Sequence, residues 1–292
     1  MKEERQVSVR EIVESNLATR HNPILKNLPG NAEARRREMQ EVIEASPTLI
    51  IEKQFEQARQ VLTRFGLVDG AGNPTHGGVP LPNIQKVADS FSMDQLKLAL
   101  SSHFHRPTFL LVPEISFQSL RQAIDTHRVK RQELTLCTEP FNADDGRTER
   151  VSRWKPVIVE GANGPRINSL QPELTERLRD FVKRTHPVRG SVSYGLNRND
   201  YAILIMLSMS ESGKVEHLID RNSSTILTGD PALDVSSETH RGIPIGKFRK
   251  YDPPKFPYEN AVSFYMSQGH FSGNLYGGHW IRSAVAGNTI EE

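Results

Sequence analysis

The chain has 292 residues and a single cysteine, Cys137. One cysteine excludes an intrachain disulfide and a zinc site built from several cysteines. A lone thiol agrees with a reducing compartment, so we expect a cytoplasmic protein. Cys137 has neither the glycine-rich turn nor the helix start that would activate a catalytic thiol, and we interpret it as a residue of the core or its margin.

Long apolar runs and a strong net charge are also missing. The longest apolar run, residues 201–207, is far too short to span a bilayer, and the charged N-terminus has no apolar core of a secretory signal. The formal net charge is +2, from 37 basic and 35 acidic residues. A net charge this small does not attract the whole chain electrostatically to nucleic acid or to an anionic membrane, so we expect neither as a partner.

The short motifs of several large enzyme classes are absent as well. The chain has no GxSxG nucleophile elbow, no GxGxxG or GxxxxGK[ST] phosphate loop, and no HExxH metal motif. We therefore expect no cofactor, and the sequence favours a protein without enzymatic activity.

The residues that are present predict an α+β fold. Residues 1–104 are expected to be helical, apart from a loop at 67–82 that is rich in glycine and proline. Residues 105–292 are expected to form a mixed domain with a central helix at 201–209 that is apolar on all sides. This domain should end in short antiparallel strands, with residues 261–267 and 281–286 in one sheet.

Local signals mark helix ends within the first region. One helix carries apolar residues at steps of three and four between Ile51 and Phe65, and Gly66 is suited to end it. The pair Ser92 and Gln95 has capping-box spacing, which favours two short helices in place of one long helix.

Two histidines are spaced as ligands of one metal ion. In an extended segment, the side chains of His103 and His105 would leave the same face, with His270 or His279 as a distant third ligand. The alternative is a pair of surface histidines, and no second motif supports the metal. We therefore expect no metal, and we keep a metal-assisted hydrolase that uses His103 and His105 as an alternative function.

A stretch of basic and aromatic residues covers positions 247–258, and a shorter basic cluster covers 128–131. Interleaved cations and aromatic rings can bind single-stranded nucleic acid. They also fit a solvated edge strand whose lysines discourage aggregation. The balance of charge over the whole chain favours the edge strand.

Residues 269–287 read GHFSGNLYGGHWIRSAVAG and differ from the rest of the chain. The connection at 268–279 is too long for a tight hairpin, and its glycines permit unusual backbone angles. Its other side chains are of the kinds that recognition surfaces use. We predict a binding surface made of His270, Phe271, Ser272, Asn274, Tyr276 and His279. Trp280, by contrast, is expected to be buried.

The order of segments over residues 195–286 resembles C-terminal domains with a C-type-lectin-like fold. Such domains occur in bacterial and phage proteins and in the formylglycine-generating-enzyme superfamily. They often end in two glycines, a small residue and a tryptophan, followed by an arginine. Gly277, Gly278, Trp280 and Arg282 match this pattern, with His279 at the position of the small residue. The resemblance implies a binding module with an irregular loop surface near the C-terminus. It does not carry over the superfamily's oxidase chemistry, because the cysteine pair is missing.

The sequence therefore predicts a non-enzymatic protein that recognises a protein or another macromolecular surface through its C-terminal loops. The hydrolase is one alternative. The other is a structural or assembly protein whose charged helices make oligomer contacts, so that a homo-oligomer also fits the sequence. Metal analysis of the purified protein separates the hydrolase from the other two, and light scattering separates the assembly protein.

Overall fold

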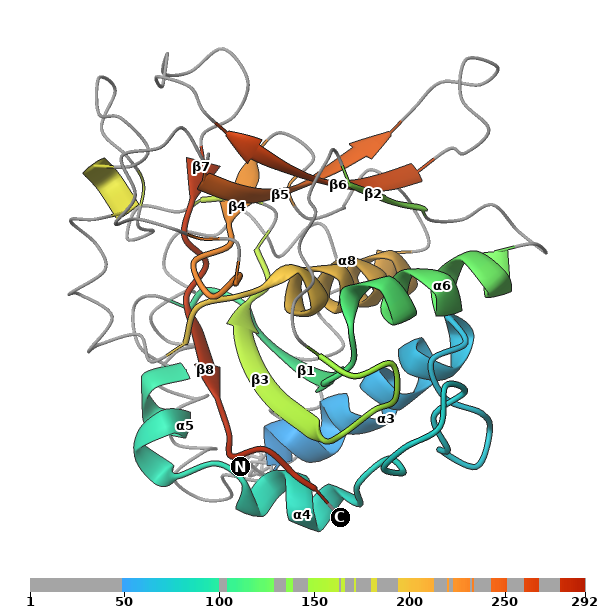
Figure 1. Cartoon of the computed structure of the whole chain (residues 1–292). Helices are drawn as coiled ribbons and strands as arrows, with labels where there is room; N and C mark the ends of the chain where they lie inside the picture. Colours follow the sequence, from blue (N-terminus) through green and yellow to red (C-terminus); the bar gives the residue numbers. More distant parts are fainter. Residues whose placement is uncertain are drawn as a thin grey trace, which may run out of the picture.

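The computed structural model describes residues 49–99, 104–128, 135–138, 147–162, 164–165, 171, 180–182, 194–212, 220, 223–231, 233, 243–250, 260–267 and 279–291. Helices and two small sheets make up this part of the chain, so the expected α+β class is confirmed (Figure 1). The helices are α3 (Leu49–Arg64), α4 (Ile84–Asp89), α5 (Met93–Ala99), α6 (Phe117–Arg128) and α8 (Arg198–Ser212). None of the helices in these ranges is both long enough and apolar enough to cross a lipid bilayer.

The first sheet has three antiparallel strands in the order β1 (Pro107–Pro113), β3 (Trp154–Glu160) and β8 (Ala284–Ala286). Every residue of β1 and β3 is buried, including the charged residues Lys155 and Glu160 of β3. Burial on both faces explains why the two strands are mostly apolar instead of alternating. Prolines fit both ends of β1 because it is an edge strand and need not donate every ladder hydrogen bond. The helix α5 packs against β8, and both α3 and α8 pack against β1.

The second sheet has five strands in the order β2-β6-β5-β4-β7. Its members are β2 (Thr135–Thr138), β6 (Asn260–Ser267), β5 (Ile243–Lys250), β4 (Ser224–Ile226) and β7 (His279–Trp280). The three inner strands are antiparallel, whereas the outer strands β2 and β7 run parallel to their neighbours β6 and β4. The sheet is therefore mixed.

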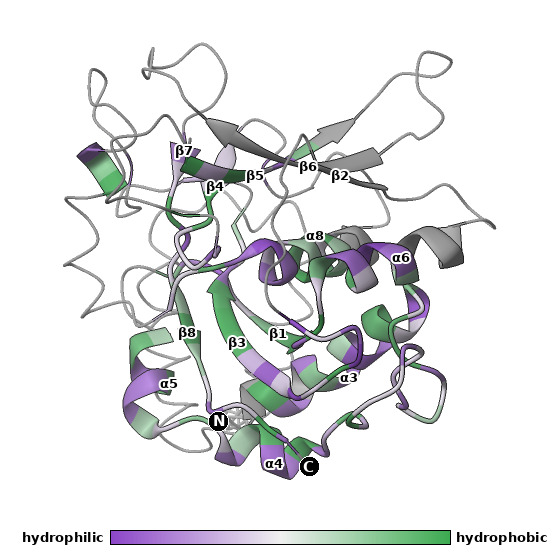
Figure 2. Ribbon diagram, viewed as in Figure 1, coloured by the Kyte–Doolittle hydropathy of each residue, from purple (hydrophilic) through white to green (hydrophobic). Residues whose placement is uncertain are grey.

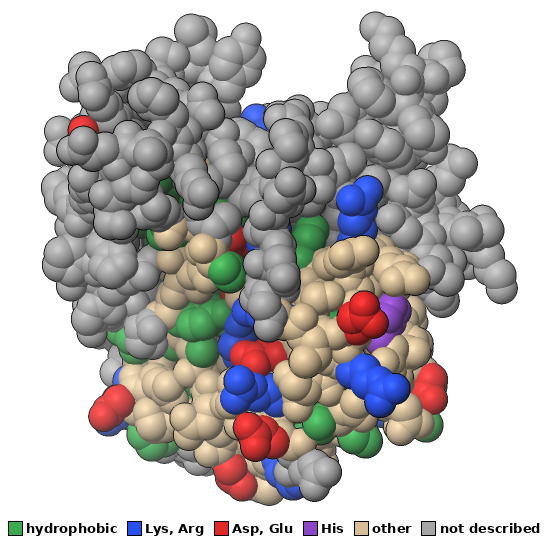
Figure 3. Space-filling model, in the orientation of Figure 1, with side chains coloured by type: hydrophobic (Ala, Val, Ile, Leu, Met, Phe, Trp, Pro, Cys, Tyr) green, Lys and Arg blue, Asp and Glu red, His purple; other side chains and the backbone are tan. Residues whose placement is uncertain are grey.

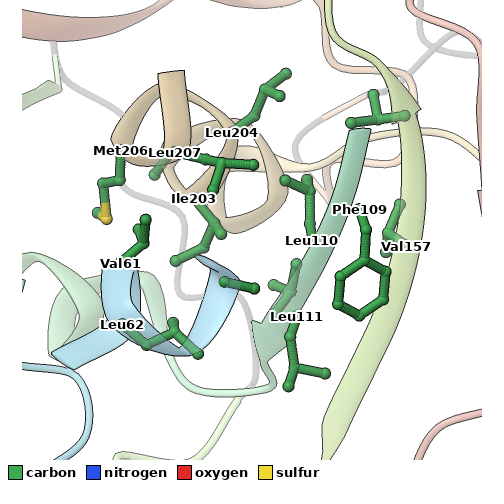
Figure 4. Packing of buried hydrophobic residues seen from close by; sticks show 14 of the residues in the cluster. Val61, Leu62, Phe109, Leu110, Leu111, Val157, Ile203, Leu204, Met206 and Leu207 are labelled. Atoms are coloured by element: carbon green, nitrogen blue, oxygen red, sulfur yellow. The ribbon is translucent and has the colours of Figure 1, made fainter. Parts of the chain in front are cut away.

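The helix α8 lies between the two sheets (Figure 1). It contacts β1 of the first sheet and β5 and β6 of the second. All its side chains from Tyr201 to Ser208 are buried, which confirms the predicted central helix over the residues whose side chains are described. Side chains from α3, α8, β1 and β3 meet in the main core, and hydrophobic residues concentrate along the strands there (Figures 2 and 4).

The local helix signals are confirmed in detail. Gly66 has φ of 72°, a left-handed backbone that suits glycine just after the last turn of α3. The backbone N–H of Ser92 donates to Oε1 of Gln95 at 2.8 Å, and the N–H of Gln95 donates to Oγ of Ser92 at 3.2 Å. This reciprocal capping box begins α5 and separates it from α4. Within residues 49–99 the prediction of helices around one loop therefore holds, whereas residues 1–48 lie outside the described part.

The prediction that residues 261–267 and 281–286 share one sheet is wrong. The first segment forms β6 of the five-stranded sheet, and the second provides β8 of the three-stranded sheet. The chain crosses between the sheets after Trp280, because the backbone carbonyl of Ser283 accepts from the N–H of Glu160 at the end of β3. The two-residue strand β7 also corrects the expectation of antiparallel ends, since it runs parallel to β4.

Candidate functional site

The carboxylate of Asp220, which precedes β4 in the chain, is buried and has several partners. Asp220 has no exposed surface, and its φ of 56° places it in the left-handed region. Its two carboxylate oxygens accept hydrogen bonds from four side chains: Tyr201 Oη at 3.0 Å, Ser223 Oγ at 2.6 Å, Trp280 Nε1 at 3.1 Å and Thr225 Oγ1. The fifth contact is an ion pair, with Nη2 of Arg282 at 2.8 Å from Oδ1. We call these five residues and Asp220 the Asp220 cluster.

Arg282 joins this cluster to the three-stranded sheet. Its Nε donates to Oγ1 of Thr225 at 2.8 Å, within the five-stranded sheet. Its Nη1 donates to the backbone carbonyls of Glu160 at 2.7 Å and Ala162 at 2.9 Å, at the end of β3. The guanidinium carbon also lies 4.2 Å from the centre of a Trp280 ring, which is cation–π distance. Arg282 therefore links the two sheets at the point where the chain crosses between them.

The Asp220 cluster fixes the beginning of β7. Because β4 and β7 are parallel, both strands begin at the same end of the sheet. Trp280 is 1 % exposed, so the predicted burial of this indole is confirmed. The segment at 268–278, which carries most of the predicted binding residues, leads directly into this anchored strand.

His279 is the one predicted binding residue that the structure describes. Its imidazole is half-buried, and its Nδ1 forms a hydrogen bond with Oγ of Ser224, the residue directly opposite in the β4–β7 ladder. Burial and the positive charge of Lys247 lower the pKa of His279 to about 4, and the negative charge of Asp220 acts in the opposite direction. The imidazole is therefore neutral at pH 7.

The Ser224–His279 pair is poorly suited to nucleophilic catalysis. Ser224 is 1 % exposed, so a substrate carbonyl has little access to its hydroxyl. A general base works best when its pKa lies near the working pH, whereas the pKa of His279 is about 4. The pair can instead hold the imidazole in one orientation at the entrance to β7.

The remaining predicted binding residues lie outside the described part of the chain. They are His270, Phe271, Ser272, Asn274 and Tyr276. The metal candidate His103 lies outside it as well. His105 is exposed, and its backbone N–H donates to the carboxylate of Glu160. Among the described residues, no three His, Cys, Asp or Glu side chains gather as a metal ion would require.

A second buried ion pair fixes the start of α8 on β3. Nζ of Lys155 lies 2.9 Å from Oδ1 of Asp200, and the hydroxyl of Tyr194 donates to Oδ2 of Asp200 at 2.6 Å. The backbone N–H of Asn197 donates to the same Oδ2 at 2.9 Å. Burial and the charge of Asp200 raise the pKa of Tyr194 well above its ordinary value of 10, so this hydroxyl stays protonated. The contacts of Asp200 therefore stabilise the packing of α8 on β3.

The described surface offers no competing apolar site. Met93, at 42 % exposure, is the single large hydrophobic side chain that is exposed among the side chains whose burial the structure describes. On the face in Figure 3, cationic and acidic side chains are interspersed over the described part. A macromolecular partner that needs an apolar contact is therefore not expected to dock on these residues.

The sequence did not point to the Asp220 cluster, apart from Trp280, which was expected to be buried, and Arg282, which was named only through the resemblance. Asp220 and Thr225 belong to no motif and no periodic pattern. Comparison with protein-family models, curated protein sequences and solved structures identified no match for this chain.

Proposed function

We propose that the protein binds a protein or another macromolecular surface through the segment 268–279, and that the Asp220 cluster holds the end of this segment in place. The observation that carries the proposal is the anchoring of β7. Trp280, which immediately follows the segment, donates to the buried carboxylate of Asp220, and Arg282 forms an ion pair with the same carboxylate. The segment thus leads into a fixed point of the sheet.

An anchored end favours binding for an energetic reason. A loop loses conformational entropy when a partner orders it, and this loss is smaller when part of the loop is already held. The buried hydrogen bonds and the ion pair around Asp220 restrain the residues that follow the segment. The composition of the segment complements this support, because Tyr and Phe supply contact area while Ser, Asn and Gly adapt to a partner.

A C-type-lectin-like arrangement remains part of the proposal. Such a binding module would present irregular loops near its C-terminus. The crossing of the chain between two sheets after Trp280 is compatible with a loop-rich surface of this kind.

The experiment compares three single substitutions of the full chain with the wild type. We expect Tyr276→Ala and Phe271→Ala to change the free energy of unfolding by less than about 1 kcal/mol, because surface truncations are usually mild. Trp280→Ala should lose about 3–5 kcal/mol, because it removes a buried indole. Thermal melting of the purified proteins measures this difference. If all three variants melt equally early, the segment is part of the core and the proposal is wrong.

Binding is measured with the same proteins. Immobilised wild-type protein captures partners from an extract of the source cells, and mass spectrometry compares the captured set with that of the double variant Tyr276→Ala/Phe271→Ala. Met93→Ala is the matched control, because Met93 is exposed and lies on α5. A partner that the double variant loses and the Met93 variant retains supports the proposal. Equal capture by all variants contradicts it.

A further inference from the structure

We draw no further inference here: the strongest candidate, the cluster of buried polar side chains of Asn197, Arg198, Asn199 and Asp200 at the N-terminus of α8, carries nothing because each of them already has a partner within the chain and nothing in the described ranges indicates a ligand at this helix end.

Discussion

Nη2 of Arg282 lies 2.8 Å from Oδ1 of Asp220, and both side chains are fully buried. Removing two charges from water is costly, and their mutual attraction offsets this cost only when the remaining polar atoms also find partners. Asp220 meets this condition with four further donors, and Arg282 meets it with Thr225 and two backbone carbonyls. Removing one partner of the pair should therefore lower the free energy of unfolding much more than replacing both partners.

Arg282→Met should lower the free energy of unfolding by about 3–5 kcal/mol, because it leaves the carboxylate of Asp220 buried without its cation. Urea denaturation of the purified variant measures the loss. The double variant Asp220→Leu/Arg282→Met should lose less than the sum of the two single variants. Arg153→Met is the control, because Arg153 forms an exposed ion pair with Glu114, 2.6 Å between Nε and Oε2, and should cost far less. Equal losses for the two arginine variants would contradict the prediction.

His279 should make the fold less stable in acid. Its pKa is about 4 in the folded protein and 6.5 when unperturbed, so below pH 6.5 the unfolded chain binds a proton that the folded protein does not. Stability is therefore lost as the pH falls from 6.5 to 4, by up to about 3 kcal/mol, and His279 has no such effect above pH 6.5.

His279→Gln removes this pH dependence. The measurement is the difference in unfolding free energy between the wild type and the variant, followed across pH 4 to 6.5 and again above it. This difference should change with pH only inside the window. A difference that stays constant across the window would show that His279 titrates normally in the folded state.

Gly246→Ala should be destabilising because the new Cβ would lie 2.6 Å from a carbon of the Tyr201 ring. Both residues are buried, so the ring can move only by displacing its neighbours. Overpacking of this kind costs about 1–3 kcal/mol. Gly70→Ala is the matched control, since a Cβ there would meet nothing within 4 Å. Thermal melting compares the two variants, and a Gly246 variant as stable as the Gly70 variant would refute the close packing of β5 on α8.

Two apolar residues of α3 should respond differently to truncation. Leu62 has no exposed surface, so Leu62→Ala should cost about 2–5 kcal/mol. Phe55 is half-buried at the edge of the same core, and Phe55→Ala should cost clearly less. Chemical denaturation of the two variants measures the difference, and an equal or larger loss for Phe55 would contradict the structure.

The same pair illustrates what the sequence could predict about the fold. Helical spacing placed both residues on the apolar stripe of α3, and the capping box of Ser92 and Gln95 separated α4 from α5. These features are decided by atoms within a few residues of each other. How deeply Phe55 is buried depends on which distant elements cover the end of the stripe, and periodicity carries no information about that.

The Asp220 cluster was beyond prediction for a related reason. Arg282 donates to the carbonyl of Glu160, 122 residues away, and the partners of Asp220 come from three separate parts of the chain. No local pattern encodes such a meeting. The alternating residues at 281–286 indicated one strand, but the contacts of Arg282 and Ser283 with the end of β3 direct the chain into the other sheet.

The pairing of β8 with β3 also sets an order for synthesis and folding. β3 can pair with β1 as soon as both have left the ribosome, but its other edge stays open until residues 284–286 emerge. An open edge strand invites pairing with other chains, and contacts of such large sequence separation form slowly. The nascent protein therefore carries an aggregation-prone edge while the residues between β3 and β8 are synthesised, and we expect it to depend on chaperones during that interval.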